Sequence, residues 1–225
     1  MSRALLVVGL SLAVLVGATG CGDDGGNDGE TATAATDTQA ATGCASVEAP
    51  AAREDGGGTA PTERLDPERT WTLTFETSCG TFVVTLDPTN APETTASLVA
   101  LAEDGFFDDT VFHRIVPGFV IQGGDPTQTG SGGPGYSTVD PPPSDTAYVK
   151  GVVAMAKTGA EPPGTAGSQF FVVTGDDVGL PPEYAVVGEV TQGLDVVELI
   201  DTQGDPATEE PLQPIVVESV TASGR

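Results

Sequence analysis

The sequence has few basic residues, and this scarcity limits the classes of partner it can bind. Lysine and arginine together number 8 against 33 aspartates and glutamates, which gives a formal net charge of -25. Because contacts to phosphate groups are made by Lys and Arg, this composition excludes a nucleic-acid-binding protein. The same charge would repel other anionic surfaces. It is typical of a solvated, aggregation-resistant exterior and points to no particular partner.

Histidine and aromatic residues are also restricted. His113 is the only histidine, and because a single imidazole is a poor basis for a metal site, we expect no bound metal. The eight phenylalanines, three tyrosines and one tryptophan all follow residue 70, so the later residues must build the hydrophobic core. From Trp71 onward roughly 150 residues remain, the usual length of one stable domain. We therefore predict a single domain over residues 70–225.

The N-terminus lacks an apolar run long enough to span a membrane. Arg3 is followed by an apolar stretch over residues 4–16, whereas a membrane helix needs about 20 residues. A basic residue, a short apolar stretch and then small residues are typical of a secretory signal peptide. We therefore predict a signal peptide over residues 1–20 and export of the chain.

Residues 17–21, Gly-Ala-Thr-Gly-Cys, resemble a bacterial lipobox, in which the cysteine becomes the acylated first residue of the mature protein. Ala18 departs from the leucine that is usual at its position. The resemblance implies lipidation of Cys21 and attachment to the outer face of the cell membrane. The alternative is ordinary secretion after cleavage nearby.

Residues 21–69 are a low-complexity segment rich in Gly, Thr, Ala and Asp. Such a segment offers too little apolar surface to offset the entropy lost on ordering. We therefore predict a disordered, acidic N-terminal tether.

Three cysteines are present, and two remain if Cys21 is acylated. Cys44 and Cys79 then form an even pair in an oxidising compartment, which favours a disulfide between the tether and the first hairpin. The alternative is two unpaired thiols, because sequence alone does not give the distance between their Cα atoms.

From Trp71 the apolar residues follow regular patterns. Alternation on both sides of a turn at residues 78–80 predicts a β-hairpin. An early proline and a following glycine predict a helix over residues 91–103, and a second short helix is expected at residues 194–200. Further short apolar runs lie at residues 111–115, 119–122, 151–156, 170–174, 185–190 and 215–220. Many short strands with only two helices indicate an antiparallel barrel rather than alternating βαβ units.

Two long motifs follow in the second half of the chain. Residues 112–125 read FHRIVPGFVIQGGD, and residues 167–171 read GSQFF after GVVAMA at residues 151–156. These motifs closely resemble the signature of the cyclophilins, and a looser resemblance covers residues 71–221. It implies an eight-stranded antiparallel β-barrel capped by two helices, with peptide bound in a groove on the outside. It also implies peptidyl-prolyl cis-trans isomerase activity.

The chemistry implied by this resemblance needs no nucleophile. Rotation about an Xaa-Pro bond crosses a barrier of about 20 kcal/mol, because it destroys amide resonance. By resemblance, Arg114 donates to the prolyl nitrogen in the twisted state only, which is differential binding of the transition state. An acceleration of ~10⁵ corresponds to roughly 7 kcal/mol, whereas one charge-assisted hydrogen bond supplies about 1.5 to 3 kcal/mol. An apolar pocket for the proline ring must supply the remainder.

The resemblance also implies the residues of the site. The catalytic group is Arg114, Gln122 and Phe119, with Gln122 orienting Arg114 and the substrate carbonyl. The substrate-binding residues are His113, Val120, Ala156, Lys157, Gln169, Phe171, Leu180 and Tyr184. Taken without the motifs, Phe119 and Phe171 would be interpreted as core aromatics. We interpret His113 as structural support rather than as a general base or a metal ligand.

Three residues depart from the common pattern of the family. Lys157 stands where Asn is usual, at a position thought to act through its backbone. Gly179 replaces a Trp of well-known members, which bears on inhibitors of the cyclosporin type. Val120 replaces a more common Met and removes a flexible wall from the pocket.

The sequence therefore predicts an exported, monomeric peptidyl-prolyl cis-trans isomerase that needs no cofactor. It is expected to assist folding of proline-containing segments in exported proteins. Its rate should be nearly flat between about pH 6 and 9, because arginine does not titrate there. The alternative is a non-catalytic proline-peptide binding module or a surface holdase chaperone. Such a module would keep the pocket aromatics and dispense with Arg114 and Gln122, which are both present.

Overall fold

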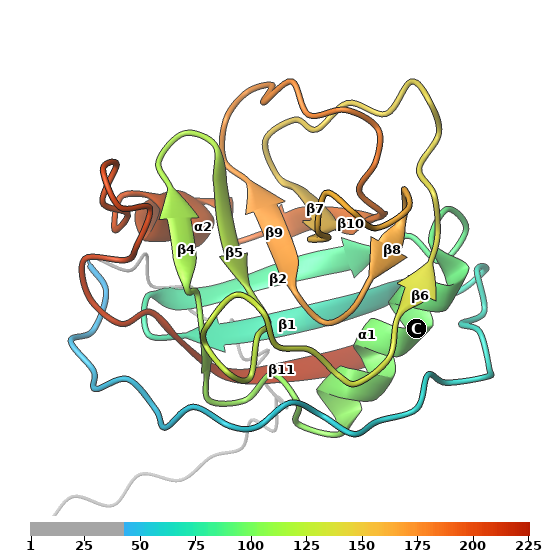
Figure 1. Ribbon diagram of the computed structural model, residues 1–225, viewed down its shortest axis with the longest axis horizontal. Helices are drawn as coiled ribbons and strands as arrows, with labels where there is room; N and C mark the ends of the chain where they lie inside the picture. Colours follow the sequence, from blue (N-terminus) through green and yellow to red (C-terminus); the bar gives the residue numbers. More distant parts are fainter. Residues whose placement is uncertain (1–42) are drawn as a thin grey trace, which may run out of the picture. The chain divides into compact units, whose positions relative to one another are not determined.

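Alternating apolar residues form the hairpin with which the barrel begins. The structure is a computed structural model that describes residues 43–225 (Figure 1). Strand β1 (Trp71–Thr77) pairs antiparallel with β2 (Gly80–Leu86). Phe75 faces Phe82 across the pair, and their rings stack with centroids 4.7 Å apart. The predicted hairpin is confirmed.

The remaining strands extend this hairpin into one curled antiparallel sheet. They are β3 (Thr110–Val111), β4 (Arg114–Val116), β5 (Val120–Gly123), β7 (Val152–Met155), β9 (Phe170–Val173), β10 (Val186–Gln192) and β11 (Val216–Gly224). The strand order is β3-β11-β1-β2-β10-β7-β9-β5-β4. Two further strands, β6 (Thr138–Val139) and β8 (Thr165–Ala166), pair separately. With two residues each, β6 and β8 are too short to produce an alternating pattern, and sequence reasoning did not find them.

The sheet closes because its first and last strands are neighbours in the chain. β3 and β4 are halves of one stretch that is interrupted at Phe112 and His113. β3 pairs with β11, β4 pairs with β5, and a bridge joins Val111 to Asp125 just beyond β5. The two halves together occupy one of eight strand positions, so the predicted eight-stranded antiparallel barrel is confirmed. The single strand expected over residues 111–115 is instead two short ones.

Two helices cover opposite ends of the barrel (Figure 1). α1 (Pro92–Glu103) packs against β11 and β6, and α2 (Leu194–Asp201) packs against β2, β4 and β5. The N-terminus of α1 is capped from a distant loop, since Asp140 accepts hydrogen bonds from the backbone of Glu93 at 3.0 Å and Thr94 at 2.7 Å. A carboxylate there satisfies unpaired N–H groups and complements the helix dipole. Both predicted helices are confirmed.

Neighbouring residues of β9 point to opposite faces of the barrel wall. Phe170 points inward, where its ring meets those of Phe75, Phe107 and Phe112 at 5.2, 6.1 and 6.0 Å. Phe171 points outward and belongs to a second, smaller apolar cluster with Val120, Tyr148, Ala154 and Val173. Because side chains alternate along a strand, one strand serves both the barrel core and an apolar surface outside it.

An N-terminal segment lies against the barrel. The prediction of a disordered tether is therefore wrong for residues 43–69. We call residues 43–60 the strap; in Figure 1 it runs past the loop that leads from β5 to β6. Its backbone donates hydrogen bonds from Arg53 to Pro126 O at 2.8 Å and from Gly58 to Pro134 O at 2.9 Å. The tether was predicted because the segment has few apolar side chains to bury. The segment is instead held by backbone hydrogen bonds and by a disulfide. Residues 1–42, with the predicted signal peptide, Cys21 and the start of the tether, lie outside the described residues.

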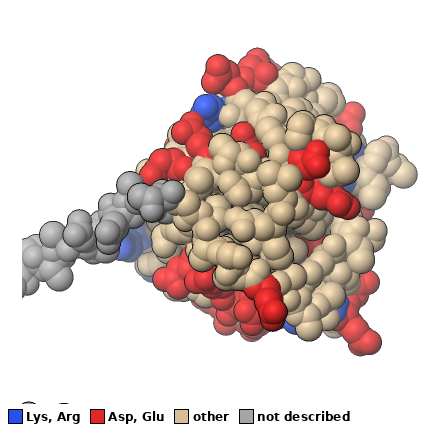
Figure 2. Space-filling model, turned by 90° about the vertical axis from the view of Figure 1, so that its left-hand side faces the viewer, with Lys and Arg blue, Asp and Glu red and all other residues tan. Residues whose placement is uncertain are grey.

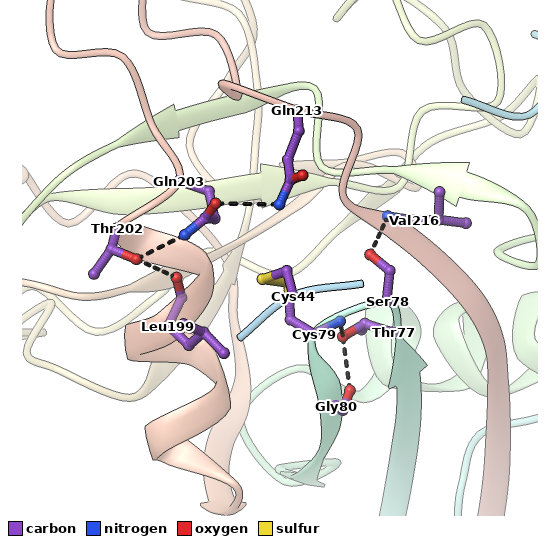
Figure 3. Close-up of a disulfide and its surroundings, with 10 residues drawn as sticks. All are labelled: Cys44, Thr77, Ser78, Cys79, Gly80, Leu199, Thr202, Gln203, Gln213 and Val216. Atoms are coloured by element: carbon purple, nitrogen blue, oxygen red, sulfur yellow. Dashed lines mark hydrogen bonds between the residues drawn. A yellow bond between two sulfur atoms is a disulfide. The ribbon is translucent and has the colours of Figure 1, made fainter. Parts of the chain in front are cut away.

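A disulfide joins the strap to the β1–β2 turn (Figure 3). The Sγ atoms of Cys44 and Cys79 are 2.04 Å apart and the two residues are 35 positions apart in sequence. Beside it, the backbone N–H of Val216 donates to Ser78 Oγ at 3.1 Å. Of the two alternatives drawn from the sequence, paired cysteines or free thiols, the structure has the pair.

The exterior carries the acidic excess of the composition. Figure 2 shows Asp and Glu side chains spread over one face, with few Lys and Arg side chains among them. Within residues 43–225, no helix combines the length and the apolar character that crossing a membrane requires.

Candidate functional site

A pocket of about 180 Å³ opens on the outer face of the barrel. We call it the outer pocket. It is lined by Arg114, Phe119, Val120, Gln122, Ala156, Lys157, Phe171, Leu180 and Tyr184. All nine were expected at the site from the sequence, although they come from positions up to 70 residues apart. Of the other two expected residues, Gln169 lies in an adjoining cavity and His113 lies elsewhere.

Strand register brings the polar and aromatic residues of the outer pocket into one row. Arg114 of β4 is the pairing partner of Gln122 of β5, and Gln122 is the partner of Phe171 of β9. Phe171 in turn pairs with Ala154 of β7. Side chains at paired positions lie on the same face of a sheet. The motif residues therefore meet because three short strands are held in this register.

Arg114 is held by a residue that sequence reasoning did not find. Its Nε donates to Glu209 Oε2 at 2.7 Å, whereas Nη1 lies 3.5 Å from Gln122 Oε1. The second distance is at the limit of a hydrogen bond, so Glu209 makes the stronger contact and Gln122, as expected, the weaker one. The Arg114 side chain is 35% exposed, which leaves the Nη groups open to the pocket.

Glu209 reaches Arg114 from a loop after α2. The loop turns back on itself through a hydrogen bond from Glu209 N to Asp205 O at 2.8 Å. Ile115 N also donates to Glu209 O at 2.9 Å, which joins the loop to β4. Glu209 adopts a φ of 61°, which is unusual for a residue with a side chain. No periodic pattern marks this residue, so only the tertiary structure reveals it.

Gln122 belongs to a chain of amide hydrogen bonds along the floor of the site. Its Nε2 donates to Gln169 Oε1 at 3.1 Å, and Gln169 Nε2 donates to Gly132 O at 2.9 Å. These bonds leave Gln122 Oε1 directed toward Arg114. Gln169 therefore supports Gln122 rather than lining the outer pocket itself.

Aromatic side chains form the apolar wall. The rings of Phe171 and Tyr184 meet edge to face with centroids 5.6 Å apart. Tyr148, which was not predicted, fixes Tyr184 by donating its hydroxyl to Tyr184 O at 2.7 Å and accepting from Tyr184 N at 3.0 Å. Burial raises the pKa of the Tyr148 hydroxyl, which keeps it protonated in this role.

Lys157 presents little charge to the outer pocket. Its side chain is 2% exposed, and its Nζ lies 3.0 Å from Glu183 Oε2 and 5.4 Å from the centre of the Tyr184 ring. It also donates to the backbone oxygens of Thr158 at 3.3 Å and Glu161 at 3.2 Å. The ammonium therefore joins two loops at the rim.

His113 lies in a separate cavity of about 360 Å³, between the strap residue Ala49 and a loop over residues 210–214. Within residues 43–225 neither ring nitrogen has a hydrogen-bond partner, and both are buried. Burial lowers the pKa of His113; Asp125 opposes this shift and Arg114 adds to it. The ring is therefore neutral at pH 7 and stands outside the outer pocket.

Gly179, which precedes Leu180 of the outer pocket, has a φ of 62° and open space where a Cβ would stand. The missing aromatic side chain therefore leaves this edge of the pocket unobstructed. Among residues 43–225, no group of three or more His, Cys, Asp or Glu side chains is placed to hold a metal ion.

Comparison with known proteins identifies the family and several relatives of this chain. Residues 72–222 match the family described as "Cyclophilin type peptidyl-prolyl cis-trans isomerase/CLD". "Probable peptidyl-prolyl cis-trans isomerase A" of Mycobacterium leprae is 38% identical over 170 residues, which are 68% of this chain and 92% of that protein. "Peptidyl-prolyl cis-trans isomerase B" of Streptomyces anulatus is 37% identical over 171 residues, covering 68% of this chain and 96% of that protein.

A solved structure shows the same fold. The Cryptosporidium parvum cyclophilin type peptidyl-prolyl cis-trans isomerase, in the presence of the dipeptide Ala-Pro, is similar with a TM-score of 0.63 and 27% identity. The similarity covers 68% of this chain and 99% of that one. The strap, at residues 43–60, lies before the segment matched by the family.

Proposed function

Since the chain belongs to the family of cyclophilin-type peptidyl-prolyl cis-trans isomerases and has that activity, we propose that the outer pocket is its active site. The substrates we propose are Xaa-Pro bonds of exported proteins, whose folding the enzyme assists. The observation that carries this proposal is the position of Arg114 in a pocket whose wall includes Phe119, Phe171 and Tyr184. Gln122 lines the same pocket. A module that only binds proline would need neither residue.

In the proposed mechanism, the proline ring enters the outer pocket between Phe119, Phe171 and Leu180. Burial of the ring removes water from the adjoining amide, which strengthens electrostatic interactions at the bond that rotates. The Nη groups of Arg114 then donate to the prolyl nitrogen as its lone pair localises in the twisted state. The planar ground state lacks this acceptor, so the bond lowers the barrier and contributes little to binding.

Glu209 contributes by holding the guanidinium before substrate arrives. A long, flexible arginine side chain loses rotamer entropy when it is fixed at a reacting centre. The Nε hydrogen bond to Glu209 at 2.7 Å restricts that freedom in the free enzyme. Less ordering is then required in the transition state.

Location outside the cytoplasm is part of the same proposal. It rests on the secretory pattern of residues 1–20, on the lipobox-like residues ending in Cys21, and on the Cys44–Cys79 disulfide. Disulfides persist in oxidising compartments and are rare in the cytosol. We propose a lipid anchor at Cys21 and a monomer that acts on proline-containing segments of exported proteins.

Exchange NMR on an Ala-Pro peptide tests the mechanism. The chain should accelerate cis-trans exchange, and Arg114→Ala should lower kcat/KM by roughly 10- to 100-fold, the value of one hydrogen bond to a charged donor. Arg114→Lys should recover only part of the activity, because an ammonium lacks the planar fork held by Glu209. Undiminished catalysis by Arg114→Ala would refute the mechanism, and peptide binding without exchange by the unmodified chain would favour a binding module.

A further inference from the structure

A second cavity of about 510 Å³ adjoins the outer pocket and shares Gln122, Ala156 and Lys157 with it. We call it the strap cavity, because Asp55 of the strap forms part of its wall. We infer that the strap, through Asp55, makes this cavity select a basic side chain on a substrate residue that flanks the proline. This inference rests on the proposed function of the outer pocket.

Backbone contacts set Asp55 against the loop over residues 130–137. Gly56 N donates to Gly133 O at 2.9 Å, and Gly133 N donates to Asp55 Oδ1 at 3.0 Å. A Cβ added at Gly135, whose φ is 88°, would lie 2.2 Å from Gly56 O. Glycine is therefore required where the strap and the loop touch. These contacts fix the Asp55 carboxylate at the wall of the strap cavity.

The loop that forms the opposite wall is itself fixed by a buried carboxylate. Asp125 accepts hydrogen bonds from the backbone of Thr127 at 2.7 Å, Gly130 at 2.6 Å and Gly132 at 3.2 Å. Burial alone would raise the pKa of Asp125, but these hydrogen bonds, with that from the Thr127 hydroxyl, hold it below the usual value. The carboxylate therefore stays ionised. The strap cavity has a preformed wall, as a specificity pocket requires.

The charges at the strap cavity are unbalanced. Its charged lining residues are Asp55, Glu161 and Lys157. The Lys157 ammonium is already paired with Glu183 at 3.0 Å. Glu161 accepts a hydrogen bond from Thr158 N at 2.6 Å, which lowers the pKa of Glu161 and keeps it ionised. Two carboxylates therefore line the cavity against one cation. That cation is buried at the rim, where it is shared between Glu183 and the backbone oxygens of Thr158 and Glu161.

A substrate lysine or arginine in this cavity would complement both carboxylates, whereas a glutamate would meet repulsion. Because Asp55 is exposed to solvent, its electrostatic contribution to the substrate preference is modest. We expect a preference of about threefold in kcat/KM for Lys over Gln, and a larger one for Lys over Glu. The preference should decrease with added salt, since salt screens exposed charges.

The test compares peptides that share an Ala-Pro core and carry Lys, Gln or Glu at each of the three positions on either side. Exchange NMR gives kcat/KM for the full chain, for Asp55→Asn and for Glu54→Gln. The amide oxygen of the introduced asparagine can still accept from Gly133 N, so the strap stays docked in the first variant. Glu54 is the matched control, because it is an exposed carboxylate of the same strap that does not line the cavity.

The inference predicts that the full chain favours Lys over Glu at one position, that Asp55→Asn reduces this ratio by about threefold, and that Glu54→Gln leaves it unchanged. An equal ratio in the full chain and Asp55→Asn would overturn it. An equal loss in both variants would also overturn it, because the preference would then reflect net charge and not the cavity. Absence of exchange on every peptide would instead refute the proposed function.

Discussion

The inner and outer faces of β9 can be compared residue by residue, since Phe170 and Phe171 are consecutive and similarly buried, at 2% and 4% exposure. Phe170 is surrounded by phenylalanine rings on the inside of the closed barrel. Phe171 has Tyr148 and Tyr184 as neighbours and forms one wall of a pocket. Burial alone therefore does not separate a core residue from a site residue. The difference lies in whether packed atoms or an open pocket surround the ring.

Phe170→Ala and Phe171→Ala should give the largest and most unequal effects. Loss of the inner ring leaves a cavity in a closed core and should lower the free energy of unfolding by about 4 kcal/mol. Loss of the outer ring should cost somewhat less, about 3 kcal/mol, because the ring lines the outer pocket instead of the closed core, and it should reduce kcat/KM more strongly. Denaturant unfolding and exchange NMR measure the two quantities. Equal losses of stability and activity in both variants would break the comparison.

Cys44→Ser extends the comparison to the strap. The disulfide closes a loop of 35 residues and so restricts the unfolded chain. Removing it gives the unfolded chain more freedom and should lower the free energy of unfolding by about 3 kcal/mol. Catalysis on an Ala-Pro peptide should survive, since none of the residues lining the outer pocket belongs to the strap. Unfolding with and without reductant measures the first effect. A loss of basal activity as large as that of Arg114→Ala would contradict this division.

Glu209→Gln sharpens the account of the outer face. Both partners of the Arg114–Glu209 pair are partly exposed, at 35% and 47%, so stability should change by less than about 1 kcal/mol. The rate should fall roughly fivefold, mainly in kcat, because the guanidinium loses its fixed orientation. Glu210→Gln is the control, as the next residue along the same loop. An effect confined to KM would show that Glu209 assists binding and does not position Arg114.

His113 lies in a separate cavity, away from both rings of β9, and should give the smallest effect. Its pKa is lowered in the folded state, so the unfolded chain binds a proton more readily. Its contribution to stability is therefore complete above about pH 6.5 and decreases as the pH falls toward the lower folded value. The difference in unfolding midpoint between pH 7.5 and 5.5 should be smaller in His113→Gln than in the unmodified chain. A steep rate profile near neutral pH would instead make His113 a participant in catalysis.

Much of this molecule could be predicted because its signals are local. Alternation around the turn at residues 78–80 indicated the hairpin, Pro92 indicated the start of α1, and two contiguous motifs supplied most of the outer pocket. Glu209 could not be found in this way, because it contacts Arg114 across 95 positions from a loop without periodicity. The strap was missed for a related reason. Its order depends on backbone hydrogen bonds and a disulfide, neither of which is visible in composition.

The central claim is that Arg114 acts on the twisted amide and not on the bound ground state. Line-shape NMR on the Arg114→Ala variant with an Ala-Pro peptide yields both the dissociation constant and the rate of exchange on the enzyme. The account predicts a dissociation constant within about twofold of that of the unmodified chain, together with an exchange rate lowered roughly 10- to 100-fold. A dissociation constant that rises by the same factor as the loss in kcat/KM, with the exchange rate on the enzyme unchanged, would contradict it.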